Sequence, residues 1–207
     1  MIASHRSVFP VLSIVVFLCG ALASTNGAAN DLVSISDAES RASIEWSRAK
    51  ANGFLKDLRL RLQAGMAESP MAAIAVCAED APKIADRWST DGGVVRRTAL
   101  KVRQTDNAPT AADRATMIAF AKRLAAGESA GKVEDFVMSS SGQTRYARAL
   151  ITEAPCLVCH GENIAPAISK IIGERYPNDA ATGFRLGELR GIVVVESNRV
   201  PIVIDFR

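Results

Sequence analysis

The sequence predicts a single α+β domain in which long N-terminal helices precede an antiparallel sheet. Two observations predict it: the first half carries apolar residues at helical spacing, and the second half carries short β-branched segments between turn residues. Helices and strands that are segregated along the chain are typical of α+β proteins. A chain of 207 residues suits one such domain.

Residues 1–23 have the pattern of a secretory signal peptide. His5 and Arg6 give a basic start, the apolar stretch 8–22 is short for a membrane span, and Ala23 closes a small-x-small cleavage pattern. We expect export to the periplasm with cleavage near Ala23 and no stable membrane insertion afterwards; an uncleaved N-terminal anchor is the alternative. Residues 24–35 are then a flexible lead-in, and residues 36–207 form the domain.

The first helix is expected to begin at Ser36, because Ser36 and Glu39 form a capping box. It should run to about Gln63 and stop at Gly65. Its predicted buried face consists of Ile44, Ala51, Leu55, Leu58 and Leu62.

A second helix is expected to start at Ser69, with Pro70 in its first helical position. Pro82 should kink or break this helix, since it lacks an N–H and crowds the carbonyl of Ala78. The predicted apolar face consists of Met71, Ile74, Cys77, Ala78, Ala81, Ile84 and Trp88.

The remaining elements are predicted from turn residues and periodicity. Thr110 should cap a helix to about Ala125, with Met117, Phe120 and Leu124 facing inward. Further segments are a strand at 94–102, a hairpin of 132–138 and 144–151, a short helix within 164–176, a strand at 191–195 and an edge strand at 200–206.

Cys156, Cys159 and His160 form a C-x-x-C-H run, the attachment signature of a c-type haem. In such a site the thiols bond to the haem vinyl groups and the imidazole binds the iron. A zinc site would need a fourth ligand, and a redox dithiol would be expected within a βαβ unit that this segment lacks. We therefore expect one covalent haem c, with His160 as an iron ligand.

The second axial ligand is not a histidine, since the chain has two histidines and His5 is removed with the signal peptide. The chain after His160 contains no methionine, histidine or cysteine, which argues against an ordinary small cytochrome c. The alternatives are an open site or one of Cys77, Met66, Met71, Met117 and Met138. Cys77 lies beside the expected kink, although a free cysteine is also an ordinary buried residue.

Arg97, Lys101 and Arg103 alternate onto one face of the predicted 94–103 strand. Arg97 and Arg103 are candidates to pair with haem propionates, and a solvated strand face is the alternative. The net charge of +3 and the absence of a long basic run argue against nucleic acid as a partner.

The chain resembles the PAS-like c-type haem domain family with His/Cys axial ligation. Blocks of the sequence match in the family's order, over roughly residues 40–195: 73–77 (Ala-Ile-Ala-Val-Cys), 81–85 (Ala-Pro-Lys-Ile-Ala), 95–103 (Val-Arg-Arg-Thr-Ala-Leu-Lys-Val-Arg), 156–161 (the haem motif and Gly) and 187–191 (Gly-Glu-Leu-Arg-Gly). The resemblance implies a PAS-like sheet flanked by helices, His160 and Cys77 as the axial pair, and a redox- or gas-sensing role.

A thiolate ligand favours ferric iron and a low reduction potential, and its bond should weaken on reduction. We therefore expect a redox-responsive haem protein, in electron transfer or redox sensing, and not an enzyme. The alternative is a gas sensor that binds NO or CO. Either function requires a separate redox or signalling protein, and the N-terminal helix offers a surface for pairing with a second copy of the chain.

Overall fold

The computed structural model describes the backbone of residues 26–198 and the side chains of residues 37–198. Its centre is an antiparallel sheet in the order β1-β4-β3-β2. The four strands are β1 Gly93–Thr98, β2 Glu134–Met138, β3 Thr144–Ile151 and β4 Leu189–Ser197. Together with the helices that flank it, this sheet confirms the predicted α+β fold in one domain.

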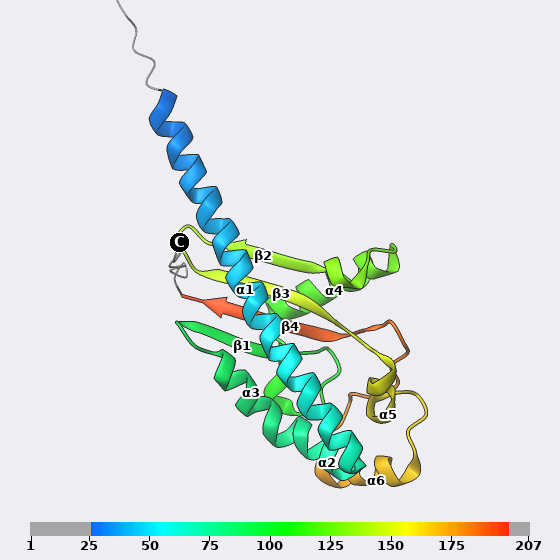
Figure 1. Cartoon of the computed structure of the whole chain (residues 1–207). Coiled ribbons are helices and arrows are strands. Elements are labelled where there is room, and N and C mark those ends of the chain that lie inside the picture. The colour runs from blue at the N-terminus through cyan, green and yellow to red at the C-terminus, as the bar shows by residue number, and fades with distance from the viewer. Residues whose placement is uncertain (1–25, 199–207) are drawn as a thin grey trace, which may run out of the picture.

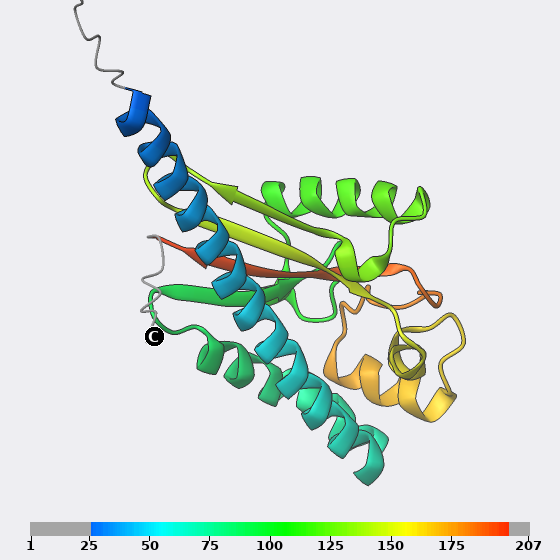
Figure 2. The same cartoon turned by 45° about the horizontal axis from the view of Figure 1, so that its top comes forward.

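Helices cover both faces of the sheet (Figures 1 and 2). The long helix α1 (Asn26–Glu68) crosses one face beside α3 (Ala81–Trp88), and α4 (Ala111–Ala125) covers the other. α2 (Pro70–Ala75), α5 (Leu157–His160) and α6 (Pro166–Arg175) form a layer beyond one end of the sheet. The N-terminal part of α1 projects past the opposite end (Figure 2).

The central strand β4 is buried on both of its faces, which explains its continuous β-branched sequence. Val193 and Val195 pack under α1 and α3 in a core with Phe54. Ile192 and Val194 pack on the other side under Met117 and Phe120 of α4. Alternation along one strand therefore supplies two cores, and the inward positions predicted for α4 are confirmed.

Helix α1 departs from the prediction at both ends. It begins at Asn26 instead of Ser36, so the backbone of residues 26–35 is helical and not a flexible lead-in. Once a helix is nucleated, each further residue adds a hydrogen bond at little cost, and no proline interrupts this stretch. Gly65 lies inside the helix because α2 packs against it: a Cβ atom there would lie 3.1 Å from Cα of Ala73.

The predicted buried face of α1 is confirmed in part, since Ala51 is fully buried and Leu55 and Leu58 pack against the same core. The most buried side chains of the helix are Ser43, Ser47, Lys50, Ala51 and Phe54. Lys50 is buried because its ammonium group donates to the carbonyl of Trp88 and to Thr90.

The second helix begins as predicted, with the Ser69 hydroxyl accepting from the N–H of Ala72 and Pro70 at the first position. It is neither broken nor ended at Pro82. Instead, α2 passes through a π turn (Val76–Asp80) into α3, with helical dihedral angles on both sides. Wider turns of this kind accommodate an irregular backbone hydrogen bond without interrupting a helix.

The predicted capping of α4 and the β2–β3 hairpin are confirmed, including reciprocal bonds between Thr110 and Asp113. The strand predicted over 94–102 ends earlier, at Thr98. The signal peptide at 1–23 and the edge strand at 200–206 lie outside the described residues. Within the described part of the chain, no helix has the length and apolarity required to cross a bilayer.

Candidate functional site

A cavity lies between the sheet end and the layer formed by α2, α5 and α6, and it gathers the sequence-predicted site residues. Cys77, Cys156, Cys159 and His160 all line it, although about 80 residues separate the first from the others. Most of the remaining wall is apolar: Leu58, Leu62, Met66, Ala73, Ile74, Ala99, Val102, Leu150, Ile151 and Pro155.

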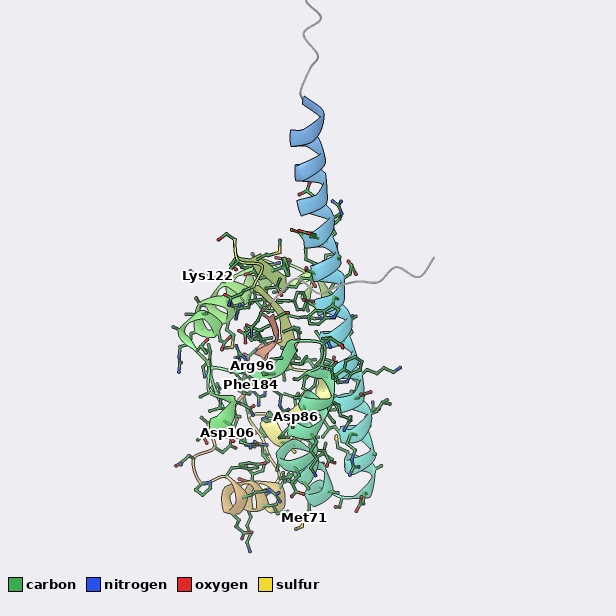
Figure 3. The ribbon with its side chains drawn as sticks, turned by 90° about the vertical axis from the view of Figure 1, so that its left-hand side faces the viewer. Met71, Asp86, Arg96, Asp106, Lys122 and Phe184 are labelled. Atoms are coloured by element: carbon green, nitrogen blue, oxygen red, sulfur yellow. The ribbon has the colours of Figure 1, made fainter. Side chains whose placement is uncertain are left out.

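The imidazole of His160 is oriented by two contacts from the loop before β4. Its Nδ1 lies 2.6 Å from the carbonyl oxygen of Ala181, so Nδ1 carries the proton and donates. Phe184 meets the ring edge-on, with centroids 6.4 Å apart, and is buried in the body of the molecule (Figure 3). The Nε2 atom is thereby left as the unprotonated nitrogen, the form that binds a metal.

Burial, together with the positive charges of Arg190, Arg103 and Arg97, lowers the pKa of His160 to about 3. The imidazole is therefore neutral at physiological pH. A neutral ring with one nitrogen tied to a carbonyl is prepared for coordination and has no role as a proton donor.

Arg103 and Asp179 hold the segment that orients His160. Their side chains, each only 8% exposed, form an ion pair at 3.0 Å. Arg103 also donates to the carbonyl of Cys159 at 2.6 Å, and the other oxygen of Asp179 accepts from the N–H of Ala181. A continuous set of contacts thus joins Arg103 to the carbonyl that fixes the imidazole.

Cys77 lies in the π turn, whose hydrogen bonding follows from Pro82. The N–H of Ala81 bonds to the carbonyl of Val76, five residues back. The next donor in that register would be Pro82, which has none, so the carbonyl of Cys77 lacks a backbone partner. Arg97 supplies one, with its Nη2 atom 3.1 Å from that oxygen.

Cys159 lies on the short helix α5, Cys156 precedes this helix as its N-cap, and Gly161 follows it as the C-cap. The N–H of Gly161 bonds to the carbonyl of Leu157, and a Cβ atom at position 161 would lie 2.6 Å from that oxygen. Glycine is therefore required directly after His160. Burial raises the pKa of the Cys159 thiol.

The chemistry of this donor set fits a haem better than the alternatives. Among residues 37–198, no three His, Cys, Asp or Glu side chains come together to hold a bare metal ion. Cys77, Cys156 and Cys159 are free thiols. A mainly apolar cavity with a neutral imidazole, adjacent thiols and guanidinium groups suits a planar apolar macrocycle that carries carboxylates.

Two of the candidate second ligands line the cavity, Cys77 and Met66. Met71 is 60% exposed and lies at the outer end of α2 (Figure 3), so its predicted place on the buried face is wrong. Met117 is buried in the core under α4, and Met138 ends β2.

The three basic residues predicted to share one strand face do not do so, because β1 ends before the last two of them. Arg97 on β1 and Arg103 in the following loop both line the cavity. Lys101 does not; its ammonium group donates to the carbonyl of Thr182 and lies over the ring of Phe184. The prediction that all three share a strand face is wrong, because the strand ends at Thr98.

Arg190 also lines the cavity, although no sequence pattern identified it as a site residue. Burial, together with the charges of Arg97 and Arg103, lowers its pKa to about 10. The matching block 187–191 contains it, but no charge pattern or spacing distinguishes it from the other arginines.

Two of the three comparisons with known proteins give a match. The family model described as Tll0287-like matches residues 25–198. A solved structure, the crystal structure of the cyanobacterial heme-protein Tll0287, is 27% identical, covers 85% of this chain and 96% of its own, and has a TM-score of 0.49. A search among curated proteins finds no match.

Proposed function

We propose a function from the premise that the chain belongs to the Tll0287-like family, whose model spans residues 25–198. The protein is an exported, redox-responsive protein with one haem c, acting in electron transfer or redox sensing without catalysis. The observation that carries this proposal is the meeting of Cys77 with Cys156, Cys159 and His160 around one apolar cavity. A similar protein, Tll0287, is named as a heme-protein, which supports it.

Each residue has a distinct part in holding the group. Cys156 and Cys159 are the thioether tethers, and Nε2 of His160 is the proximal iron ligand. The Cys77 sulfur, directed by the π turn, is the distal ligand. Bound haem supplies one-electron redox chemistry at its iron. The apolar walls exclude water, and a low dielectric around a thiolate ligand favours the ferric state.

A haem-based sensor of NO or CO is the second candidate, and one observation favours it. The carbonyl of Cys77 is held by a side chain and not by the helix backbone. A ligand mounted on such a turn can leave the iron through local rearrangement, without unfolding a helix. Loss of Cys77 on reduction would open a coordination site for a diatomic gas.

Both candidates require a separate redox or signalling protein. We propose a periplasmic location, in line with the C-x-x-C-H motif and the leader pattern at residues 1–23. The projecting part of α1 (Figure 2) offers a surface for pairing with a second copy of the chain.

Visible spectroscopy of holoprotein from a host competent in cytochrome maturation tests the proposal. The pyridine haemochrome spectrum should be that of a haem c with two thioethers, and mass spectrometry should place one haem on Cys156 and Cys159. Colourless protein from that host would refute it.

Adding CO to the reduced protein separates the two candidates. In an electron carrier the iron keeps six ligands in both oxidation states, so the spectrum should not change when CO is added. A gas sensor forms a CO complex readily.

A further inference from the structure

Three guanidinium groups line the cavity, and its wall includes no acidic side chain among the described residues. They belong to Arg97, Arg103 and Arg190, which come from β1, the following loop and β4. Like charges in an apolar surrounding repel one another, and this repulsion is one cause of the lowered pKa of Arg190. No acidic side chain of the described cavity wall neutralises these three positive charges.

Only one of the three arginines is paired with a carboxylate of the protein. Arg103 is paired with Asp179 at 3.0 Å, in surroundings that leave both side chains nearly buried. The same Nη2 atom donates to the carbonyl of Cys159, and the guanidinium lies over the ring of Tyr176. Arg103 thus braces the chain around His160.

Arg97 and Arg190 contact no carboxylate in the part of the chain that the structure describes. Arg97 uses one donor on the carbonyl of Cys77. Arg190 makes one long bond, at 3.4 Å, to the carbonyl of Lys101 and stacks over Phe184. Since a guanidinium has five N–H donors, both retain most of their hydrogen-bonding capacity.

We propose that Arg97 and Arg190 bind the two propionates of the haem, one each, and that Arg103 binds neither. This inference rests on the proposed function. Two unpaired cations match two carboxylates, which would neutralise the cavity wall. The expectation that Arg97 and Arg103 form the pair is therefore revised by the ion pair of Arg103 with Asp179.

The location of Arg190 fits a propionate, which is polar and favours contact with water. Arg190 lines both the central cavity and a neighbouring open groove that is bounded by Leu100, Met117, Leu124 and Leu186. A propionate held by Arg190 would lie where the cavity meets this groove.

Arg97 has a second consequence, because it holds the carbonyl of Cys77 as well. Its guanidinium would connect one propionate directly to the backbone of the distal ligand. Arg190 has no such contact. The two arginines are therefore equivalent toward the propionates but not toward the iron–sulfur bond.

Resonance Raman spectra of the ferric holoprotein test the proposal, because the propionate bending bands report hydrogen bonding to each carboxylate. Arg190→Gln should shift one band to lower frequency, Arg97→Gln should shift the other, and the double variant should shift both. Arg114→Gln, at an exposed position on α4, should move neither, and Arg103→Gln should move the bands no more than Asp179→Asn, which removes the same ion pair. Arg97→Gln alone should also alter the electron paramagnetic resonance signal of the thiolate-bound iron.

Arg190→Lys guards against an effect of misfolding, since it keeps the charge and should give a band between those of wild type and Arg190→Gln. Unchanged propionate bands in both Arg97→Gln and Arg190→Gln would overturn the inference while leaving the haem assignment intact. A band that moves further in Arg103→Gln than in Asp179→Asn would also overturn it. Absence of haem from the wild-type protein would refute the proposed function instead.

Discussion

At the scale of single residues, the two candidate iron ligands are each held by an arginine bound to the nearby backbone. Arg97 bonds to the carbonyl of Cys77, and Arg103 bonds to the carbonyl of Cys159, next to His160. Such supporting contacts determine ligand orientation as much as the ligands themselves. The Arg103–Asp179 pair is the more buried support, so its removal should have the larger effect on stability.

Replacing Asp179 by Asn should lower the free energy of unfolding by about 3–5 kcal/mol, because Arg103 is left as a nearly buried, unpaired charge. The matched control is Glu153→Gln, whose partner Arg59 is exposed; it should cost about 0–1 kcal/mol. Denaturant unfolding of the holoproteins measures both. Equal, small effects would mean that the Arg103 pair is not a structural support.

Asp113 provides a pH-dependent contribution on the other side of the sheet. It is fully buried, it pairs with Arg96 and Arg145, and these guanidinium groups together with bonds from Thr110 hold the pKa of its carboxyl well below its usual 3.8. A carboxyl whose pKa is lower in the folded state stabilises the protein above the unfolded-state pKa and loses this effect as the pH falls below it.

The expected consequence is a pH-dependent difference between wild type and Asp113→Asn. At pH 7 the variant should be less stable by about 3 kcal/mol, since two partly buried arginines lose their counter-charge. This difference should shrink as the pH falls below about 4. Denaturant unfolding at pH 7 and pH 3 tests it, and a difference that does not change with pH would contradict it.

At the scale of elements, the π turn determines where the Cys77 side chain lies. Its register shift leaves the cysteine carbonyl without a backbone donor, because the residue that would donate is Pro82. Arg97 then serves as a replacement donor from β1. The local geometry of Cys77, the proposed distal ligand, therefore depends on one proline and one side chain from the sheet.

Pro82→Ala should move Cys77, because the new N–H lets the helix return to ordinary α register. We expect unfolding free energy to rise by about 1 kcal/mol for the added bond, together with loss of the thiolate signature in the ferric spectrum. Pro70→Ala, at the first position of α2, is the control and should leave the spectrum unchanged. An unaltered spectrum in Pro82→Ala would show that the proline does not place the sulfur.

Elements whose signals are local could be predicted from the sequence. Ser69 and Thr110 begin their helices through their own side chains, and Gly142 lies in the turn of the β2–β3 hairpin with a φ of 78°. Elements that depend on tertiary contact could not. Gly65 remains helical because α2 packs on it, and Pro82 is tolerated because a π turn and Arg97 compensate.

The candidate site shows the same difference between residues with local sequence signals and residues placed by tertiary contacts. Cys156, Cys159 and His160 are adjacent in sequence, so their spacing alone predicts their chemistry. Arg190 reaches the cavity only because β4 lies beside β1, a pairing that no local pattern in its segment indicates.

At the scale of the whole molecule, the proposed haem lies between the sheet and the α2–α5–α6 layer. That layer has a small core of its own, consisting chiefly of Ile74, Ile168 and Ile172. The haem would supply most of the apolar contact that joins it to the sheet. A ligand that binds only the folded state stabilises the parts that it contacts.

Hydrogen exchange should therefore distinguish the holoprotein from Cys156→Ala/Cys159→Ala protein lacking haem. Amides of α5 and α6 should lose protection by at least tenfold without haem, whereas those of β4, buried between two cores, should change little. Uniform protection across both forms would mean that haem does not join the two layers.

The central claim is that Nε2 of His160 and the Cys77 sulfur bind one haem iron. Electron paramagnetic resonance of the ferric holoprotein tests it most directly, with Cys77→Ala and Met66→Leu measured beside the wild type. Wild type and Met66→Leu should give the same low-spin signal of a thiolate-bound haem, and Cys77→Ala should give a five-coordinate or water-bound iron with a raised reduction potential. A wild-type spectrum that survives in Cys77→Ala, or that is lost in Met66→Leu, would contradict the account.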